Sequence, residues 1–410
     1  MKSVKRFCAI LLLTCVPLVA PQLSRAGDSA PHAGRPKVVG YFPQWGVYGG
    51  YYVKNVVTSG SATRLTHLNY AFANVVNNAC VSYDPLADYQ LPLTADQTVD
   101  GEADSTAPGA FAGNFHQLQE LKKRYPNLQV VISLGGGGAD PNAFSSAALP
   151  ANRQGFVKSC VDMFIRGNFA PGIQEPGIFD GIDVDWEFPA TDADKTNFTA
   201  LLKEFREQLD AARPNMTLSI AAPAGGWAYQ FIELKKIQHS VTFLNLMNYD
   251  FDGPWNNATG LVAPLYQTWN DPDPSNNANA AVKAYLQMGV KSAKIVFGVP
   301  FYGYEWTDVP NVNHGLFQPG VPVGYGSGYS AIVPVEGQFS KYRDPITQAP
   351  WLYDGKNFWT YDDPVSLKFK MEYVRHQRLA GVMFWELSGD LPDGRLVKAL
   401  AKGLQRKGDE

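Results

Sequence analysis

The sequence predicts an α/β fold, a (β/α)8 TIM barrel, from three observations. From Lys37 onward the chain repeats a unit of apolar run, turn and amphipathic segment, as expected for buried parallel strands alternating with helices. Eight such runs occur, which is the number of strands in this barrel. No glycine-rich phosphate loop follows the first run, which argues against the rival fold, an open doubly wound sheet.

The predicted strands are short and mostly apolar. In order they are Val38–Phe42, Leu65–Phe72, Gln129–Leu134, Gly181–Glu187, Thr217–Ala222, Val241–Tyr249, Lys294–Pro300 and Gly381–Glu386. The clearest helix lies between the fourth and fifth strands, over Asp192–Arg213, where apolar residues recur at helical spacing. With 410 residues, 45% of them hydrophobic, the chain can bury one large core.

The first 26 residues are typical of a cleaved secretory signal. Lys2, Lys5 and Arg6 precede an apolar run over Phe7–Ala20, and small residues follow at 24 and 26. The run is short for the alternative, a membrane anchor. Its removal takes away four basic and no acidic residues, so the formal charge moves from −3 to −7. We therefore expect a secreted protein, extracellular or periplasmic, with a short leader over 27–36 and no affinity for membranes or nucleic acid.

Four acids fall within eleven residues in the stretch FDGIDVDWEFP, from Phe179 to Pro189. In a strand, Asp183, Asp185 and Glu187 share one face and alternate with apolar residues. Like charges at such spacing disfavour one another, so at least one acid should keep its proton near neutral pH and serve as a general acid. The alternative is a polar edge strand with its acids in solvent, but the apolar residues of opposite parity favour a buried strand.

The motif Asp180-x-x-Asp183-x-Asp185-x-Glu187 closely resembles the signature of glycoside hydrolase family 18, the chitinases. The resemblance implies hydrolysis assisted by the substrate's own acetamido group. Glu187 would be the acid and base, and Asp185 would hold the acetamido group and stabilise the intermediate. Asp183 would share a proton with Asp185, and Asp180 would be a structural support.

Other strand ends also match family motifs. Tyr249 would donate its hydroxyl to the acetamido oxygen, and Asp250 would bind the same sugar. The remaining positions that the resemblance marks are Tyr41, Phe72, Met247 and Trp385 around the cleaved sugar, Trp255 on the leaving-group side, and Ser133, Gly135 and Gly136 as structural support. Trp45, Trp227, Trp269 and Trp306 either extend this aromatic track or fill core and surface positions.

Two long connections break the barrel pattern. Residues 78–114 either wall one side of a cleft or form an ordinary exposed loop. Residues 303–361 contain a predicted hairpin with a tight turn at Asp354-Gly355. The resemblance implies a small α+β insertion domain here, between strand 7 and helix 7, leaving 37–302 and 362–405 as the catalytic barrel. Asp363 and Pro364 should begin the following helix.

Two positions depart from the family pattern. Gly137-Gly138 follows Gly136 where many members have Trp, and Tyr304 stands where many have Arg. These changes put substrate-chain preference in question, although the acids are intact.

The sequence thus predicts a monomeric chitinase that cleaves β-1,4 bonds between N-acetylglucosamine units. The alternatives are an endo-β-N-acetylglucosaminidase acting on glycoprotein glycans and a non-catalytic chitin-binding lectin. The six histidines form no ligand-spaced cluster, so we expect no metal and no organic cofactor. After signal removal only Cys80 and Cys160 remain, either as a disulfide or as two buried thiols.

Overall fold

The computed structural model describes residues 35–269 and 271–405. The predicted signal segment, residues 1–26, and most of the predicted leader lie outside that part. Among the described residues, no helix combines the length and the apolar character needed to cross a bilayer.

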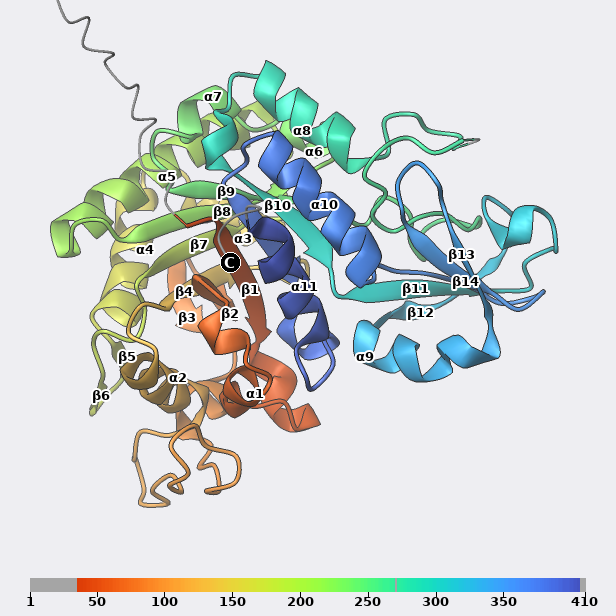
Figure 1. The fold of residues 1–410 in the computed structure, drawn as a ribbon. Coiled ribbons are helices and arrows are strands. Elements are labelled where there is room, and N and C mark those ends of the chain that lie inside the picture. Colours follow the sequence, from red (N-terminus) through yellow and green to blue (C-terminus); the bar gives the residue numbers. More distant parts are fainter. Residues whose placement is uncertain (1–34, 270, 406–410) are drawn as a thin grey trace, which may run out of the picture. The chain divides into compact units, whose positions relative to one another are not determined.

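Eight parallel strands close into a barrel (Figure 1). They are β1 (Lys37–Pro43), β2 (His67–Val76), β4 (Gln129–Gly135), β7 (Gly181–Asp185), β8 (Thr217–Pro223), β9 (Phe243–Met247), β10 (Ile295–Pro300) and β16 (Gly381–Trp385). Their order is β1-β16-β10-β9-β8-β7-β4-β2, and β1 pairs with β2 as well, which closes the ring. All eight predicted strands are present, and the predicted (β/α)8 barrel is confirmed.

The helices follow the strands along the chain. They are α1 (Val53–Thr58), α2 (Gly113–Arg124), α3 (Pro141–Ala147), α4 (Arg153–Cys160), α5 (Asp192–Ala212), α6 (Gly226–Tyr229), α7 (Leu234–Ile237), α8 (Ala278–Gln287), α9 (Tyr329–Ile332), α10 (Pro364–His376) and α11 (Arg395–Leu404). Thr191 caps α5 by accepting a hydrogen bond from the backbone N–H of Asp194. Asp363 caps α10 with Pro364 as its first residue, as predicted.

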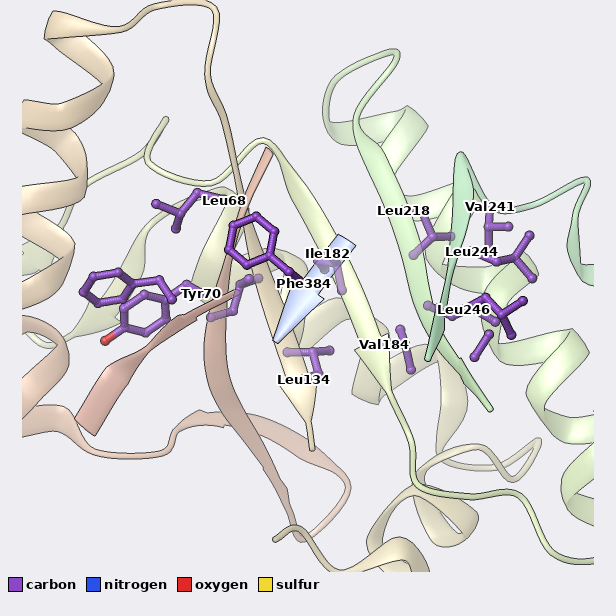
Figure 2. Packing of buried hydrophobic residues seen from close by; sticks show 14 of the residues in the cluster. Leu68, Tyr70, Leu134, Ile182, Val184, Leu218, Val241, Leu244, Leu246 and Phe384 are labelled. Atoms are coloured by element: carbon purple, nitrogen blue, oxygen red, sulfur yellow. The ribbon is translucent and has the colours of Figure 1, made fainter. Parts of the chain in front are cut away.

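The two parities of the barrel strands have different surroundings. Apolar side chains of one parity, including Leu68, Ile182 and Leu218, lie in the main buried cluster with residues of the surrounding helices (Figure 2). Side chains of the other parity fill the barrel interior, where Val39 and Met383 belong to a separate small cluster. Because successive residues of a strand point to opposite faces, the acids of β7 fall inside the barrel.

A second sheet lies between β10 and α10 in the sequence. Its strands β11 (Tyr302–Thr307), β12 (Val321–Gly328), β13 (Ser340–Arg343), β14 (Pro350–Tyr353) and β15 (Phe358–Thr360) are antiparallel, in the order β12-β11-β15-β14-β13. Trp306 and Phe358 are fully buried in its own apolar cluster. Trp306, whose place the sequence left open, is therefore a core residue. The predicted hairpin is formed by β14 and β15, with Gly355 in the left-handed conformation at its turn.

The segment after β2 returns as a short antiparallel strand, β3 (Ala79–Ser82). Cys80 on β3 forms a disulfide with Cys160 at the end of α4, with a Cα–Cα distance of 4.9 Å. The sequence left this pairing open, because spacing alone does not place two Cα atoms. A further two-stranded hairpin, β5 (Asn168–Ala170) and β6 (Ile173–Gln174), precedes β7.

Candidate active site

The three acids lie at the carboxyl end of β7. Asp183 and Asp185 are buried strand residues, whereas the predicted strand end at Glu187 is wrong, because β7 ends at Asp185. Glu187 follows two residues later and is only half-buried. A strand that stops at the mouth of the barrel leaves its last side chains free to meet a ligand, which is where barrel enzymes place their chemistry.

Asp183 lies within a buried polar network inside the barrel. Its Oδ2 accepts hydrogen bonds from Tyr41 Oη at 2.7 Å and Ser133 Oγ at 2.8 Å. Its Oδ1 accepts from Ser219 Oγ at 2.6 Å and from Asn245 Nδ2 at 3.3 Å. Burial raises the pKa of Asp183, and these four donors oppose the rise by stabilising its charged form.

Asp185 differs from Asp183 in having a buried Oδ1 with no hydrogen-bond partner among the described residues. Burial raises its pKa well above the ordinary value, and the charges of Glu187 and Asp183 add to the rise. In the described part of the chain, both oxygens of Asp183 accept from other side chains, and no hydrogen bond joins Asp183 to Asp185. The proton shared between these two acids stays a prediction.

Glu187 has the electrostatics of a general acid near neutral pH. Burial raises its pKa to about 7, with a further contribution from the negative charge of Asp250. A carboxyl group with such a pKa can give its proton to a leaving group and take one back in the same cycle.

A cleft with a volume of about 1010 Å³ opens over these acids. Both Asp185 and Glu187 line it. Of the other sequence-predicted residues, the cleft is lined by Tyr41, Phe72, Gly135, Met247, Tyr249, Asp250 and Trp385. Ser133 and Gly136, which the resemblance marks as structural supports, are not among the residues that line the cleft.

The supporting glycines allow close packing under the site. A Cβ on Gly135, whose φ is +108°, would lie 2.3 Å from the carbonyl oxygen of Asp185. A Cβ on Gly136, at φ +86°, would lie 2.5 Å from the ring of Phe72. Any larger residue would push the acid or the aromatic ring out of place.

Aromatic rings form the floor of the cleft. Trp385 stacks on Phe72 with ring centroids 5.5 Å apart and an interplanar angle of 16°. Tyr41 lies 5.5 Å and Trp45 lies 6.1 Å from the same indole. Flat apolar faces ringed by polar groups are what sugar rings need, because their C–H faces are apolar and their edges carry hydroxyls.

Asp250 lies on the cleft wall beside the second sheet. Its Oδ1 accepts hydrogen bonds from the hydroxyls of Tyr302 and Tyr304, the latter at 2.8 Å. Burial raises the pKa of Asp250, and the two hydroxyls counteract this. Tyr249 is half-buried beside it, with its hydroxyl 3.8 Å from Met383 Sδ.

Two further predicted residues, like Asp183, Ser133 and Gly136, are not among those that line the cleft. Asp180 precedes β7 at the opposite end of the barrel, where it forms ion pairs with Lys122 at 2.8 Å and Arg213 at 3.1 Å. Its opposite parity keeps it from the acids, so any support it gives is to the outer face of the barrel. Trp255 is 56% exposed and contacts Tyr304 edge-on, with ring centroids 5.7 Å apart.

Sequence reasoning missed several lining residues. They are Gln44, Tyr83, Asp84, Ala221, Phe301, Tyr302, Tyr325, Ser327, Glu386 and Gly389, among others. Glu386 directly follows Trp385, and Tyr302 lies two residues past the predicted strand end at Pro300, so both could have been inferred from strand ends. Tyr83 and Asp84 belong to the long connection over 78–114, so part of that segment forms a cleft wall. No group of three or more His, Cys, Asp or Glu residues arranged to hold a metal ion occurs in the described ranges.

Comparison with known proteins decides the family. The model described as "Glycosyl hydrolases family 18" matches residues 37–390. The chain belongs to glycosyl hydrolase family 18. Chitinase C of Streptomyces lividans is 35% identical over 90% of this chain. The catalytic domain of psychrophilic chitinase B from Arthrobacter TAD20 is 35% identical, with a TM-score of 0.84 over 91% of this chain and 96% of that one.

A family 18 N-acetylglucosaminidase from Paenibacillus barengoltzii is also similar, at 32% identity and a TM-score of 0.72, over 90% of this chain and all of that one. The chain spans 60% of the length of Chitinase C. It likewise spans 62% of the length of Chitinase 63 of Streptomyces plicatus and 61% of Chitinase A1 of Niallia circulans.

As a family 18 member, the chain has an altered cleft at two positions. Gly137 directly follows Gly136, where the family pattern carries a Trp, and a Cβ at this position would lie 3.5 Å from Glu187 Oε1. Tyr304 offers Asp250 a neutral hydroxyl where the family pattern carries the positive charge of an Arg.

Proposed function

We propose that this protein is a chitinase that hydrolyses β-1,4 bonds between N-acetylglucosamine units with retention of configuration. The observation that carries the proposal is the pairing of Asp185 and Glu187 at the carboxyl end of one strand, above an aromatic floor. Both carboxyl groups reach the substrate from the β7 side, so neither is placed to attack the opposite face of the sugar. The substrate's acetamido oxygen takes that role.

The proposed reaction has two steps. The acetamido oxygen bonds to the anomeric carbon while Glu187 gives its proton to the departing glycosidic oxygen, which breaks the C–O bond. Water then adds to the anomeric carbon as Glu187 takes a proton from it, and the oxazolinium ring opens. Asp185 stabilises the positive charge of the intermediate, and Tyr249 orients the acetamido oxygen with its hydroxyl.

Asp183 is proposed to act through Asp185. With four hydrogen bonds stabilising its negative charge, it favours the proton on Asp185 before the substrate binds. The proton keeps Asp185 neutral beside Glu187 before the substrate binds. When Asp185 shares this proton with Asp183, its carboxylate accepts from the acetamido N–H and offsets the positive charge of the intermediate. Trp385 supplies the platform for the sugar that is cleaved.

The segment 303–361 is proposed as the α+β insertion domain of the enzyme. It supplies Tyr304, Tyr325 and Ser327 to one wall of the cleft, which supports a role in binding the sugar chain. We also propose that the protein acts as a secreted monomer after removal of residues 1–26, since its polymeric substrate is too large to enter a cell.

The rival activities differ in their substrates. The N-acetylglucosaminidase neighbour makes release of single sugars from chain ends the second candidate, and cleavage of glycoprotein glycans is a third. A lectin function is disfavoured because Glu187 is present with a pKa of about 7.

Product analysis on colloidal chitin, chitin hexamer and a high-mannose glycoprotein separates these candidate activities. We expect mostly dimers and longer products from the first two substrates and none from the glycoprotein.

Replacing Glu187 with Gln tests the catalytic assignment. The amide keeps the shape of the side chain but has no acidic proton, so kcat on chitin hexamer should fall by a hundredfold or more. Binding of the hexamer should persist, because the aromatic floor is unchanged. Activity within a few-fold of wild type would refute the role of Glu187.

A further inference from the structure

An irregularity in the second sheet lies at the edge of the cleft. Strand β12 pairs with β11 through Gly303 with Ser327 and through Glu305 with Val323. Between these pairs, Tyr304 alone faces the three residues 324–326. The extra residues form a bulge, and bulges next to active sites commonly redirect a side chain.

Two glycines shape this bulge. Gly324 has a φ of +64° and Gly326 a φ of +101°, conformations that residues with a Cβ rarely adopt. A Cβ on Gly326 would lie 3.0 Å from the ring of Tyr304 and 3.1 Å from the carbonyl oxygen of Gly303. The bulge therefore packs flat on Tyr304, which is itself buried and hydrogen-bonded to Asp250.

The residue between the glycines is Tyr325, which is 96% exposed and yet lines the cleft. Its phenol ring makes almost no contact with the rest of the protein, so both ring faces are available. Gly326 packs on Tyr304 at the base of the bulge, and Tyr325 is one of the residues that line the cleft. Nothing in the folding of the sheet requires an aromatic residue at so exposed a position.

The position of Tyr325 relative to the acids follows from the barrel. In the closed strand order, β16 lies directly across the ring from β7. Gly328, at the end of β12, approaches Gly389 just after β16, where an added Cβ would be 3.0 Å from the Gly389 Cα. The end of β12, three residues after Tyr325, therefore lies beside the end of β16, across the ring from the strand that carries the acids.

We propose that Tyr325 is a substrate-binding residue whose ring stacks on an N-acetylglucosamine ring of the bound chain. The proposal rests on the proposed function and adds a contact from the second sheet. A pyranose presents an apolar C–H face that packs well on a phenol ring. The packing of Gly326 on Tyr304 holds the backbone of the bulge in the free protein, so the ordering needed when the sugar binds is that of the Tyr325 side chain.

The test is the affinity of chitin hexamer for the Glu187→Gln variant, measured by calorimetry with and without a second substitution. Adding Tyr325→Ala should weaken binding about tenfold, as expected for the loss of one aromatic contact. Adding Tyr325→Trp should keep the affinity within about twofold, because a ring face remains. Val323→Ala is the matched control, since Val323 is an exposed residue of the same strand outside the cleft lining.

A fourth variant tests the bulge itself. Gly326→Ala keeps the Tyr325 ring but forces the backbone away from Tyr304, so hexamer affinity should again fall while thermal unfolding confirms the fold. Unchanged affinity in the Tyr325→Ala variant would overturn the proposal. If the parent Glu187→Gln protein fails to bind hexamer at all, the proposed function has failed and this inference fails with it, a result distinct from a loss confined to Tyr325.

Discussion

At the scale of single residues, the site contains three carboxyl groups that differ in burial and in hydrogen bonding. Asp183 is held by four donors, Asp185 has a buried oxygen without a partner, and Glu187 stands half-open to the cleft. Three acids on one strand end thus have three environments. The pattern of acids alone predicts that one keeps its proton, whereas only the structure shows which oxygen atoms are engaged.

The pKa of Glu187 leads to a prediction about pH. The proposed reaction needs a protonated acid, so kcat/KM should fall as pH rises through about 7. This alkaline limb of the pH profile reports the titration of Asp185 and Glu187 together, because the charge of each affects the other. The negative charge of Asp250 helps Glu187 keep its proton. In the Asp250→Asn variant the limb should therefore move to lower pH, whatever happens to the maximal rate.

The control for this pH experiment is Asp84→Asn. Asp84 also lines the cleft, but it is not among the groups that shift the pKa of Glu187. Its replacement removes the same charge and keeps the Oδ1 that accepts from the backbone of Leu86. A limb that moves equally in both variants, or in neither, would contradict the specific role of Asp250.

At the scale of elements, the disulfide ties the β2–β3 hairpin to α4. Tyr83 and Asp84 follow β3 directly and line the cleft, so the bond holds the base of one cleft wall. A neighbouring hydrogen bond, from the backbone N–H of Cys80 to Ser159 Oγ at 2.9 Å, acts in the same place. The hairpin therefore has both a covalent and a polar attachment to the barrel.

Removing the disulfide should lower stability more than activity. The bond closes a loop between residues 80 apart in sequence, and the chain-entropy model assigns such loops about 4 kcal/mol. The double variant Cys80→Ala and Cys160→Ala should unfold at clearly lower urea concentration than wild type. Reductant should shift wild type to the same midpoint and leave the variant unchanged; an equal midpoint for all samples would refute a stabilising role.

At the scale of the whole molecule, the sequence predicted the barrel because each strand is a short apolar run between turns. It predicted the acids of β7 and the floor around Trp385 because these lie at strand ends. The cleft residues that come from outside the barrel strands were harder to predict. Tyr325 reaches the cleft through a bulge in β12, and Asp84 reaches it from a loop after β3. Such positions depend on pairing between distant segments, which local pattern does not encode.

At the scale of the whole barrel, the position of Glu386 raises the question of which group is the nucleophile. Glu386 follows β16, across the ring from Glu187, and is the carboxylate on the opposite wall. Its two oxygens accept hydrogen bonds from the backbone N–H and the hydroxyl of Ser388, so it caps its own loop. The structure thus offers a concrete rival to the acetamido group, and the engaged state of Glu386 argues against it.

Two aryl glycosides that differ only in an acetamido or a free amino group on the sugar before the bond distinguish these nucleophiles. If the acetamido oxygen attacks, the amino compound should react at least about a hundredfold more slowly, because the intramolecular nucleophile is gone. Glu386→Gln should keep most of the activity on the acetamido compound. NMR within the first minutes should show the β anomer as the initial product. Comparable rates on both glycosides, together with loss of activity in Glu386→Gln, would instead identify Glu386 as the nucleophile and remove the roles given to Asp185 and Tyr249.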